Sequence, residues 1–261
     1  MSVTVADLAR TDHLLVALDF DGTLAPLVDE PMTARATPAA KAAVAALLDA
    51  PATTVAFVSG RSLHDLRVIG EHDDASSIAL AGSHGAEFWL PAELAEHDDA
   101  AGAATDDEAA LRDRLRAEAE ALAANVDGAW IEPKAFGFAV HTRTTTDAAD
   151  AATLGDAVDA LVAADAPTWR RRVGHDLREY AFRDVGKDGA VAHLRDLSGA
   201  TAVVFAGDDV TDEDALRSLG DADLGIRVGG GETAASVRVD DIAGLADLLM
   251  TLAHARSASR Q

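Results

Sequence analysis

The stretch that decides the fold is HLLVALDFDGTL, residues 13–24, an apolar run that ends in two carboxylates. Its apolar part, 13–20, predicts a buried strand, because parallel strands covered on both faces form continuous apolar runs. Ligands bind at the carboxyl ends of such strands, which places Asp19 and Asp21 at the site-forming edge of the sheet. Residues i and i+2 of an extended chain point to the same side, so both carboxylates can address one ligand.

Further short apolar runs alternate with helical patterns along both ends of the chain. We expect strands at 53–60, 77–85, 201–209 and 222–229. We expect helices near 38–49, 62–69, 212–219 and 241–255. Alternating strands and helices indicate a parallel sheet with helices on both faces. The sequence therefore predicts an α/β fold with a doubly wound, parallel-sheet (Rossmann-like) core.

The middle of the chain has a different pattern, which begins with an acidic, low-complexity stretch at 91–108. It predicts, in order, helix 109–125, hairpin 129–143, helix 147–164 and hairpin 168–182, the last turning at Gly174. Helices combined with hairpins in this way form an α+β unit. We therefore expect a catalytic core built from residues 1–85 and 181–261, and an inserted α+β cap at residues 86–180 that sets substrate specificity.

The chain is strongly acidic, with 45 Asp and Glu against 22 Lys and Arg and a formal net charge of -23 over 261 residues. Self-repulsion of this size destabilises a compact protein unless salt screens it. Lysine occurs only at positions 41, 134 and 187. This composition indicates a halophilic protein in a cytoplasm with molar salt, where the Debye length falls to about 3 Å. An acidic protein adapted to ordinary salt is the alternative.

The composition also argues against several classes of partner and chemistry. An anionic surface disfavours nucleic acids and anionic membranes as partners. The absence of cysteine excludes disulfides, thiolate nucleophiles and zinc–thiolate sites. The first residues, MSVTVADLARTDHLL, lack the basic and long apolar regions of a signal peptide or membrane span. We therefore expect a cytoplasmic protein that acts on a small molecule.

Two further polar groups stand at predicted strand or helix ends. Ser59-Gly60-Arg61 follows the second strand, and a hydroxyl with a free amide at a helix N-terminus forms an anion site. A helix cap is the simpler explanation of this serine taken alone. Lys187 stands at a predicted helix start, where its charge opposes the helix dipole unless nearby anions compensate. A solvated surface lysine is the alternative.

An acidic cluster, GDDVTDED at 207–214, follows the strand predicted at 201–209. Several carboxylates at one strand end need a cation to be stable. Hard oxygen ligands beside a phosphate favour Mg²⁺. Asp212 also suits the N-cap of the next helix, and Glu213 and Asp214 suit its first turn, where acidic residues are favoured by the helix dipole.

In their order along the chain, these parts resemble the haloacid dehalogenase superfamily, whose phosphatases begin with DxDGT. The resemblance implies that Asp19 is a nucleophile that forms an aspartyl-phosphate, and that Asp21 is the general acid and base. It implies phosphate binding by Ser59, Gly60, Asp19 and Lys187, of which Lys187 is also catalytic. It implies a Mg²⁺ cofactor held by Asp19, Asp208 and the backbone carbonyl of Asp21. It also implies that Asp209 belongs to the metal site, bonded to metal-bound water or to Lys187.

Longer segments are similar to trehalose-6-phosphate phosphatases, namely LAGSHGAE (80–87), IEPKAFGFAVHTR (131–143), GDDVTDEDAL (207–216) and GIRVGGGETAASVRV (225–239). The similarity implies hydrolysis of trehalose 6-phosphate beneath a cap that closes over the disaccharide. It implies substrate contacts from Arg61, His84, Glu132, Lys134, His141, Arg143 and Glu179. Positions 132, 134, 141 and 143 alternate along two predicted strands and can share one face. One departure is EYAFRDVGK (179–187), which lacks the family's short Arg-Pro before the lysine.

Several alternatives remain open at this point. The same motifs suit other sugar phosphates, such as sucrose 6-phosphate or mannosyl-3-phosphoglycerate. A phosphomutase of the same superfamily would keep the paired carboxylates, and a catalytically silent sugar-phosphate sensor would keep the fold. A trehalose-phosphate synthase is a candidate protein partner.

Overall fold

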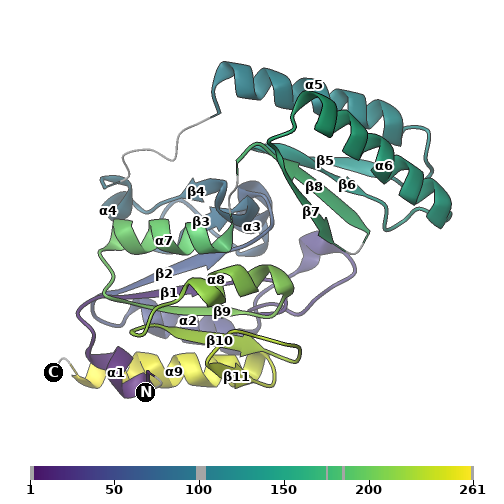
Figure 1. Ribbon diagram of the computed structural model, residues 1–261. Coiled ribbons are helices and arrows are strands. Elements are labelled where there is room, and N and C mark those ends of the chain that lie inside the picture. Colours follow the sequence, from purple (N-terminus) through teal and green to yellow (C-terminus); the bar gives the residue numbers. More distant parts are fainter. Residues whose placement is uncertain (1–2, 98–103, 175, 184–185, 260–261) are drawn as a thin grey trace. The chain divides into compact units, whose positions relative to one another are not determined.

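The computed structural model describes residues 3–97, 104–174, 176–183 and 186–259 (Figure 1). The chain divides into two compact units. The first, called the core unit, comprises Met1–Ala101 and Val185–Gln261. The second, called the inserted unit, comprises Gly102–Asp184. The division therefore falls later along the chain than the boundaries expected at 86 and 180.

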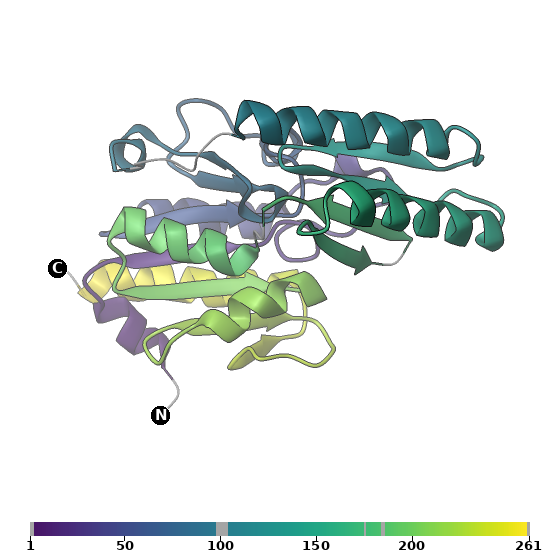
Figure 2. The same ribbon diagram turned by 45° about the horizontal axis from the view of Figure 1, so that its top comes forward.

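A seven-stranded sheet in the order β11-β10-β9-β1-β2-β3-β4 forms the centre of the core unit (Figures 1 and 2). Neighbouring strands are parallel except for β4, which runs antiparallel to β3. The strands are β1 (Leu14–Leu18), β2 (Thr53–Val58), β3 (Ala79–Gly82), β4 (Glu87–Trp89), β9 (Ala202–Gly207), β10 (Leu224–Val228) and β11 (Val237–Val239). The sheet confirms the predicted doubly wound α/β core.

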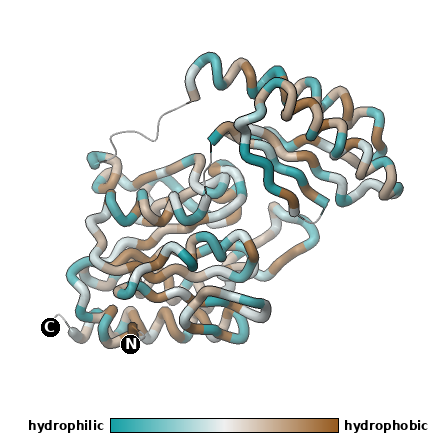
Figure 3. The backbone as a smooth tube through the Cα atoms, viewed as in Figure 1, coloured by the Kyte–Doolittle hydropathy of each residue, from teal (hydrophilic) through white to brown (hydrophobic). Residues whose placement is uncertain are grey.

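Both faces of this sheet are covered by helices, as the fully buried strand β1 requires. Leu14, Val16 and Leu18 pack in a cluster with α1, α2, α3 and α9, whereas Leu15 and Ala17 pack with α7 and α8. Figure 3 shows hydrophobic residues along the central strands. The helices are α1 (Val5–Arg10), α2 (Pro38–Leu48), α3 (Leu63–Ile69), α7 (Lys187–Ser198), α8 (Glu213–Ser218) and α9 (Ile242–Ser259). Within the described ranges, no helix is long and apolar enough to cross a membrane.

The inserted unit is an antiparallel sheet, β5-β6-β8-β7, with two long helices packed on one face. Phe138, Val140 and Tyr180 point to these helices, so the residues that alternate with them lie on the opposite face. The elements are α5 (Asp106–Ala123), β5 (Trp130–Lys134), β6 (Gly137–His141), α6 (Ala148–Asp165), β7 (Arg170–Gly174) and β8 (Leu177–Ala181). The predicted α+β insert is thereby confirmed.

In the described residues, three 3₁₀ turns and four short α-helices and strands were not predicted from the sequence, the latter being α1, α4 (Ala92–Ala95), β4 and β11. Helix α4 lies within the stretch 91–108 that we expected to be a loop, of which residues 98–103 lie outside the described part. Strand β4 pairs with β3, with Phe88 opposite Ala81, so the core sheet continues past residue 85. Elements of three to six residues are too short for hydrophobic periodicity to identify them.

Candidate active site

Asp19 and Asp208 follow two neighbouring strands of the core sheet. The register pairs Leu18 with Ala206 across β1 and β9, so both strands end at the same edge. The backbone N–H of Asp19 extends this ladder by donating to Ala206 O at 2.9 Å. The Asp19 side chain is buried there. The topology therefore brings together two carboxylates that lie far apart in the sequence.

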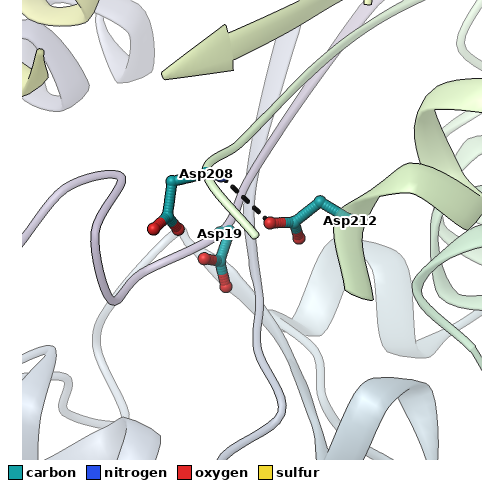
Figure 4. A group of neighbouring side chains, drawn as sticks. All are labelled: Asp19, Asp208 and Asp212. Carbon is teal, nitrogen blue, oxygen red and sulfur yellow. Dashed lines mark hydrogen bonds between the residues drawn. The ribbon is translucent and has the colours of Figure 1, made fainter. Parts of the chain in front are cut away.

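Lys187 reaches this edge from the first residue of α7. Its Nζ lies 2.6 Å from Asp19 Oδ1 and 2.6 Å from Asp212 Oδ1, and all three side chains are at most 6% exposed. The other oxygen of Asp212 accepts the backbone N–H groups of Asp208 and Asp209 at 3.0 and 2.9 Å. Asp212 thus holds both the lysine and the loop after β9. Figure 4 shows its hydrogen bond with Asp208.

The electrostatics of this cluster follow from its burial. Burial raises the pKa of Asp19 well above its usual value, and the charges of Asp212 and Asp208 add to the effect of burial while Lys187 opposes it. Burial and the charge of Asp212 also raise the pKa of Asp208. For Lys187 burial alone would lower the pKa, but the two paired carboxylates outweigh it and raise the pKa. The lysine therefore stays charged while the acids lack a sufficient counter-charge.

The acids fit a divalent cation. Asp19, Asp208 and Asp212 each place a carboxylate oxygen within 4.8 Å of the others (Figure 4). When all three carboxylates are ionised, as metal binding requires, they and the single ammonium of Lys187 carry a net charge of -2 (-3 + 1). All of the donors are hard oxygens, which Mg²⁺ prefers. Both oxygens of Asp212 already accept hydrogen bonds, one from Lys187 and the other from two backbone amides. Asp19 and Asp208 are therefore the carboxylates best able to bind the metal directly.

Two residues of the turn after β1 shape this acid pair. Thr23 Oγ1 lies 3.4 Å from Asp19 Oδ2 and 3.2 Å from Asp208 Oδ1, so its one proton is shared between them. Gly22 has a φ of +77°, and a Cβ at this position would lie 2.0 Å from Asp208 Oδ2. The turn therefore needs glycine both for its conformation and for the space that Asp208 occupies.

The structure corrects the expected contact of Asp209 with Lys187, whereas its contact with metal-bound water stays a prediction. This side chain is exposed, and the second carboxylate that contacts Lys187 is Asp212 rather than Asp209. A 3₁₀ turn, Val210–Asp212, folds Asp212 back onto the backbone of the loop. The spacing of the acids in GDDxxD (207–212) could have indicated a role for Asp212 in the site. In the sequence, however, a helix cap explained Asp212 equally well.

Arg61 contacts Asp21 in this structure. Its Nε donates to Asp21 Oδ2 at 2.7 Å and its Nη2 to Oδ1 at 2.6 Å, a bidentate pair. Such a pair fixes the orientation of a carboxylate more firmly than a single hydrogen bond does. Both residues were predicted to act in the site, but their contact with each other was not predicted.

Ser59 and Gly60 lie at the same edge of the sheet, beyond the end of β2. Ser59 is buried, and its Oγ accepts the Arg61 N–H at 3.2 Å. The backbone N–H of His84 donates to Ser59 O at 2.9 Å. A Cβ at Gly60 would lie 2.7 Å from two atoms of the His84 ring, so this ring packs closely over the loop. The predicted phosphate-binding residues and His84 therefore gather beside the acid cluster.

In the inserted unit, three predicted substrate-binding residues form one hydrogen-bonded group. Lys134 Nζ lies 2.6 Å from Glu132 Oε1, and His141 Nε2 lies 2.9 Å from Glu132 Oε2. Burial opposes ionisation of Glu132, but its bonds to His141 and Lys134 outweigh burial and lower its pKa. Glu179 lies on the same face, since Glu132 and Glu179 both pair with Ala139 in the sheet register.

Arg143 lies apart from that group. Strand β6 ends at His141, two residues before Arg143, so the alternation that would have placed Arg143 on the polar face does not reach it. Arg143 instead lines a cavity of about 380 Å³ together with Val140, Arg178 and the first turn of α6. Val140 and Arg178 belong to the face that the helices cover. The expectation that positions 132, 134, 141 and 143 share one face is therefore wrong for position 143.

Comparisons with known proteins agree over most of the chain. Residues 17–241 match the family model described as trehalose-phosphatase. A "Trehalose-phosphate phosphatase" of Mycolicibacterium paratuberculosis is 37% identical over 215 residues, which cover 79% of this chain and 51% of that protein. The chain spans about half the length of this relative and of the Mycobacterium avium "Trehalose-phosphate phosphatase", which is 36% identical.

Two solved structures have the same fold. A trehalose-6-phosphate phosphatase related protein has a TM-score of 0.70 at 22% identity, covering 95% of this chain and 100% of that one. The C-terminal domain of Candida albicans trehalose-6-phosphate phosphatase has a TM-score of 0.73 at 17% identity, covering 96% and 95%. At these identities the likeness supports the fold alone.

Proposed function

We propose that this chain, which belongs to the trehalose-phosphatase family, hydrolyses trehalose 6-phosphate to trehalose and inorganic phosphate. The observation that carries the proposal is the buried contact of Lys187 with Asp19, beside Asp208 at the end of the adjacent strand. A phosphoryl group needs a nucleophile and positive charge around its oxygens, and this edge of the sheet supplies both.

In the proposed mechanism, Asp19 attacks phosphorus in line with the sugar oxygen, and the P–O bond to the sugar breaks. The product of this step is an aspartyl-phosphate on Asp19. Lys187 neutralises negative charge on the phosphoryl oxygens, and the Ser59 hydroxyl with the neighbouring amides binds the remaining oxygens. Asp19 and Asp208, whose oxygen donors fit Mg²⁺, would hold that ion, which would supply further charge neutralisation.

Asp21 is proposed to move the protons. It donates one to the departing sugar oxygen and then accepts one from the water that hydrolyses the aspartyl-phosphate. Both of its oxygens accept hydrogen bonds from Arg61, so the acid form requires Arg61 to release at least one of them. The substrate phosphate is an alternative partner for this guanidinium, because bidentate arginine–phosphate pairs are strong. Substrate binding would thereby free Asp21 for its acid role.

The inserted unit is proposed to recognise the sugar. Glu132, Lys134 and His141 form a preorganised polar group, with Glu179 on the same face. A substrate rich in hydroxyls needs many such donors and acceptors, and a site built to bind them rejects ligands that leave them unpaired. Arg143 is left out of this proposed site because it lines the separate cavity.

Release of phosphate from a panel of sugar phosphates, with Mg²⁺ and KCl supplied, tests the proposed function. We expect trehalose 6-phosphate to give the highest kcat/KM. A higher kcat/KM for sucrose 6-phosphate or mannosyl-3-phosphoglycerate would change the proposed substrate but not the proposed phosphatase reaction. An isomerised sugar phosphate without free phosphate would identify a phosphomutase, and no turnover of any ester would identify a sensor.

The cellular setting is also a proposal. The net charge of -23 supports a halophilic, cytoplasmic enzyme that needs salt to screen its surface. A trehalose-phosphate synthase, which makes this substrate, is the proposed partner. Co-purification of the two proteins at the working salt concentration would test that partnership.

A further inference from the structure

The turn after β3 has an uncommon backbone. Ser83, His84 and Gly85 follow one another with φ values of +49°, +57° and +96°. Residues other than glycine rarely adopt positive φ, and adjacent examples persist only where the surrounding structure holds them. This turn, residues 83–85, therefore needs specific contacts to keep its conformation.

Several of these contacts join the turn to the phosphate-binding loop, residues 59–61. The backbone N–H of Ser83 donates to Arg61 O at 2.6 Å, and that of His84 donates to Ser59 O at 2.9 Å. Close packing adds to these bonds, because a Cβ at Gly82 would lie 2.6 Å from Leu63 N. The two segments therefore form one unit, and a shift of the turn would move the loop.

Glu87, the first residue of β4, lies where the two segments meet. Its Oε2 accepts the Ser83 hydroxyl at 2.6 Å and the backbone N–H of Leu63 at 3.2 Å. Leu63 is the first residue of α3, the helix that follows the phosphate-binding loop. One carboxylate oxygen thus ties the turn to the start of this helix, and hydrogen bonds to a charged acceptor are among the stronger ones in proteins.

We propose that Glu87 is a positioning residue for the phosphate-binding loop. It touches neither the acid cluster nor, in the proposed mechanism, the substrate. It acts through Ser83 and Leu63, which fix the backbone of Ser59 and Arg61. Arg61 in turn binds Asp21 through its guanidinium. By fixing the backbone of Arg61, Glu87 therefore also fixes the point from which this side chain extends. This inference rests on the proposed function of the site as a phosphate-binding centre.

Affinity for inorganic phosphate, measured by calorimetry with Mg²⁺ and KCl present, tests the inference without relying on the identity of the sugar. We expect Glu87→Ala to weaken phosphate binding about tenfold, because two hydrogen bonds to a charged group are lost. Glu87→Gln retains a carbonyl oxygen that can accept both bonds, so its affinity should stay within about threefold of the unmodified protein. Glu93→Ala, which changes an exposed glutamate on α4, is the matched control and should leave phosphate affinity unchanged.

Ser83→Ala keeps the test decisive if Glu87→Ala does not fold, because it removes one of the two bonds and leaves the glutamate in place. Its phosphate affinity should lie between those of the unmodified protein and a tenfold loss. Phosphate affinities of Glu87→Ala or Ser83→Ala equal to that of Glu93→Ala would overturn the inference, as would an unmodified protein that does not bind phosphate. Phosphate binding without hydrolysis of trehalose 6-phosphate would instead contradict the proposed function alone.

Discussion

Replacing Lys187 by methionine removes the ammonium group that contacts Asp19 and Asp212 and keeps most of the aliphatic volume of the side chain. The exposed fractions of the three side chains are 3%, 6% and 0%, so water cannot take the place of the lost charge. The change leaves three clustered carboxylates without their ammonium partner. We expect it to destabilise the fold strongly when no divalent metal is added.

The size of the effect follows from this burial. Removing one partner of a buried ion pair costs about 3–5 kcal/mol, because the other charge stays buried and unpaired. The matched control is Lys41→Met, since Lys41 pairs with Glu71 at the surface, with side chains 48% and 52% exposed. Exposed pairs contribute roughly 0–1 kcal/mol. The two variants should therefore differ by at least about 2 kcal/mol in the free energy of unfolding.

Urea unfolding at one fixed KCl concentration, followed by circular dichroism, measures this difference. Added Mg²⁺ should raise the unfolding midpoint of Lys187→Met more than that of the unmodified protein, because the variant site carries the full negative charge. If Lys187→Met lost no more stability than Lys41→Met, the buried cluster would not have the electrostatics described here.

Four further changes test other parts of the account. Gly22→Ala should lower Mg²⁺ affinity at least about tenfold, because its Cβ would displace Asp208; calorimetric titration with an unchanged affinity would contradict this. The pKa values of Asp19 and Asp208 are raised in the folded protein, so between pH 3.8 and these raised pKa values the folded state binds more protons than the unfolded state. The stability of the metal-free protein therefore falls as the pH rises through this range. Since Mg²⁺ displaces these protons, the gain in melting temperature on adding it should be larger near about pH 7 than near about pH 5, and an equal gain would argue against the shifts. The melting temperature should rise with KCl, and a salt-independent value would refute the halophilic assignment. Glu132→Gln should raise KM for trehalose 6-phosphate about tenfold and leave hydrolysis of a small aryl phosphate within about twofold; equal losses on both substrates would remove sugar recognition from this residue.

The gathering of Asp19, Asp208 and Lys187 at one edge of the sheet could be predicted because it depends on residue types at strand and helix ends. Asp19 and Asp208 each follow a buried apolar strand, and parallel strands bring such ends together whatever the loop details. Lys187 was recognisable because a lysine at a helix start needs nearby anions. Asp19 and Asp212 are those anions in the structure.

The remaining contacts depend on geometry that the sequence does not encode locally. Asp212 rather than Asp209 reaches Lys187 because a three-residue 3₁₀ turn reverses the chain. The pair between Arg61 and Asp21 joins residues 40 positions apart, through loops whose path periodicity does not define. Arg143 was misplaced because the prediction extended β6 past its last residue, and strand ends are the least predictable part of an element.

Mass spectrometry of the protein quenched in acid during turnover of trehalose 6-phosphate would detect the proposed aspartyl-phosphate on Asp19. We expect a phosphoryl group on the peptide that contains Asp19, located to that residue by fragmentation and absent from Asp19→Asn. Steady turnover with no phosphoryl group on Asp19, or undiminished turnover by Asp19→Asn, would contradict the proposed mechanism.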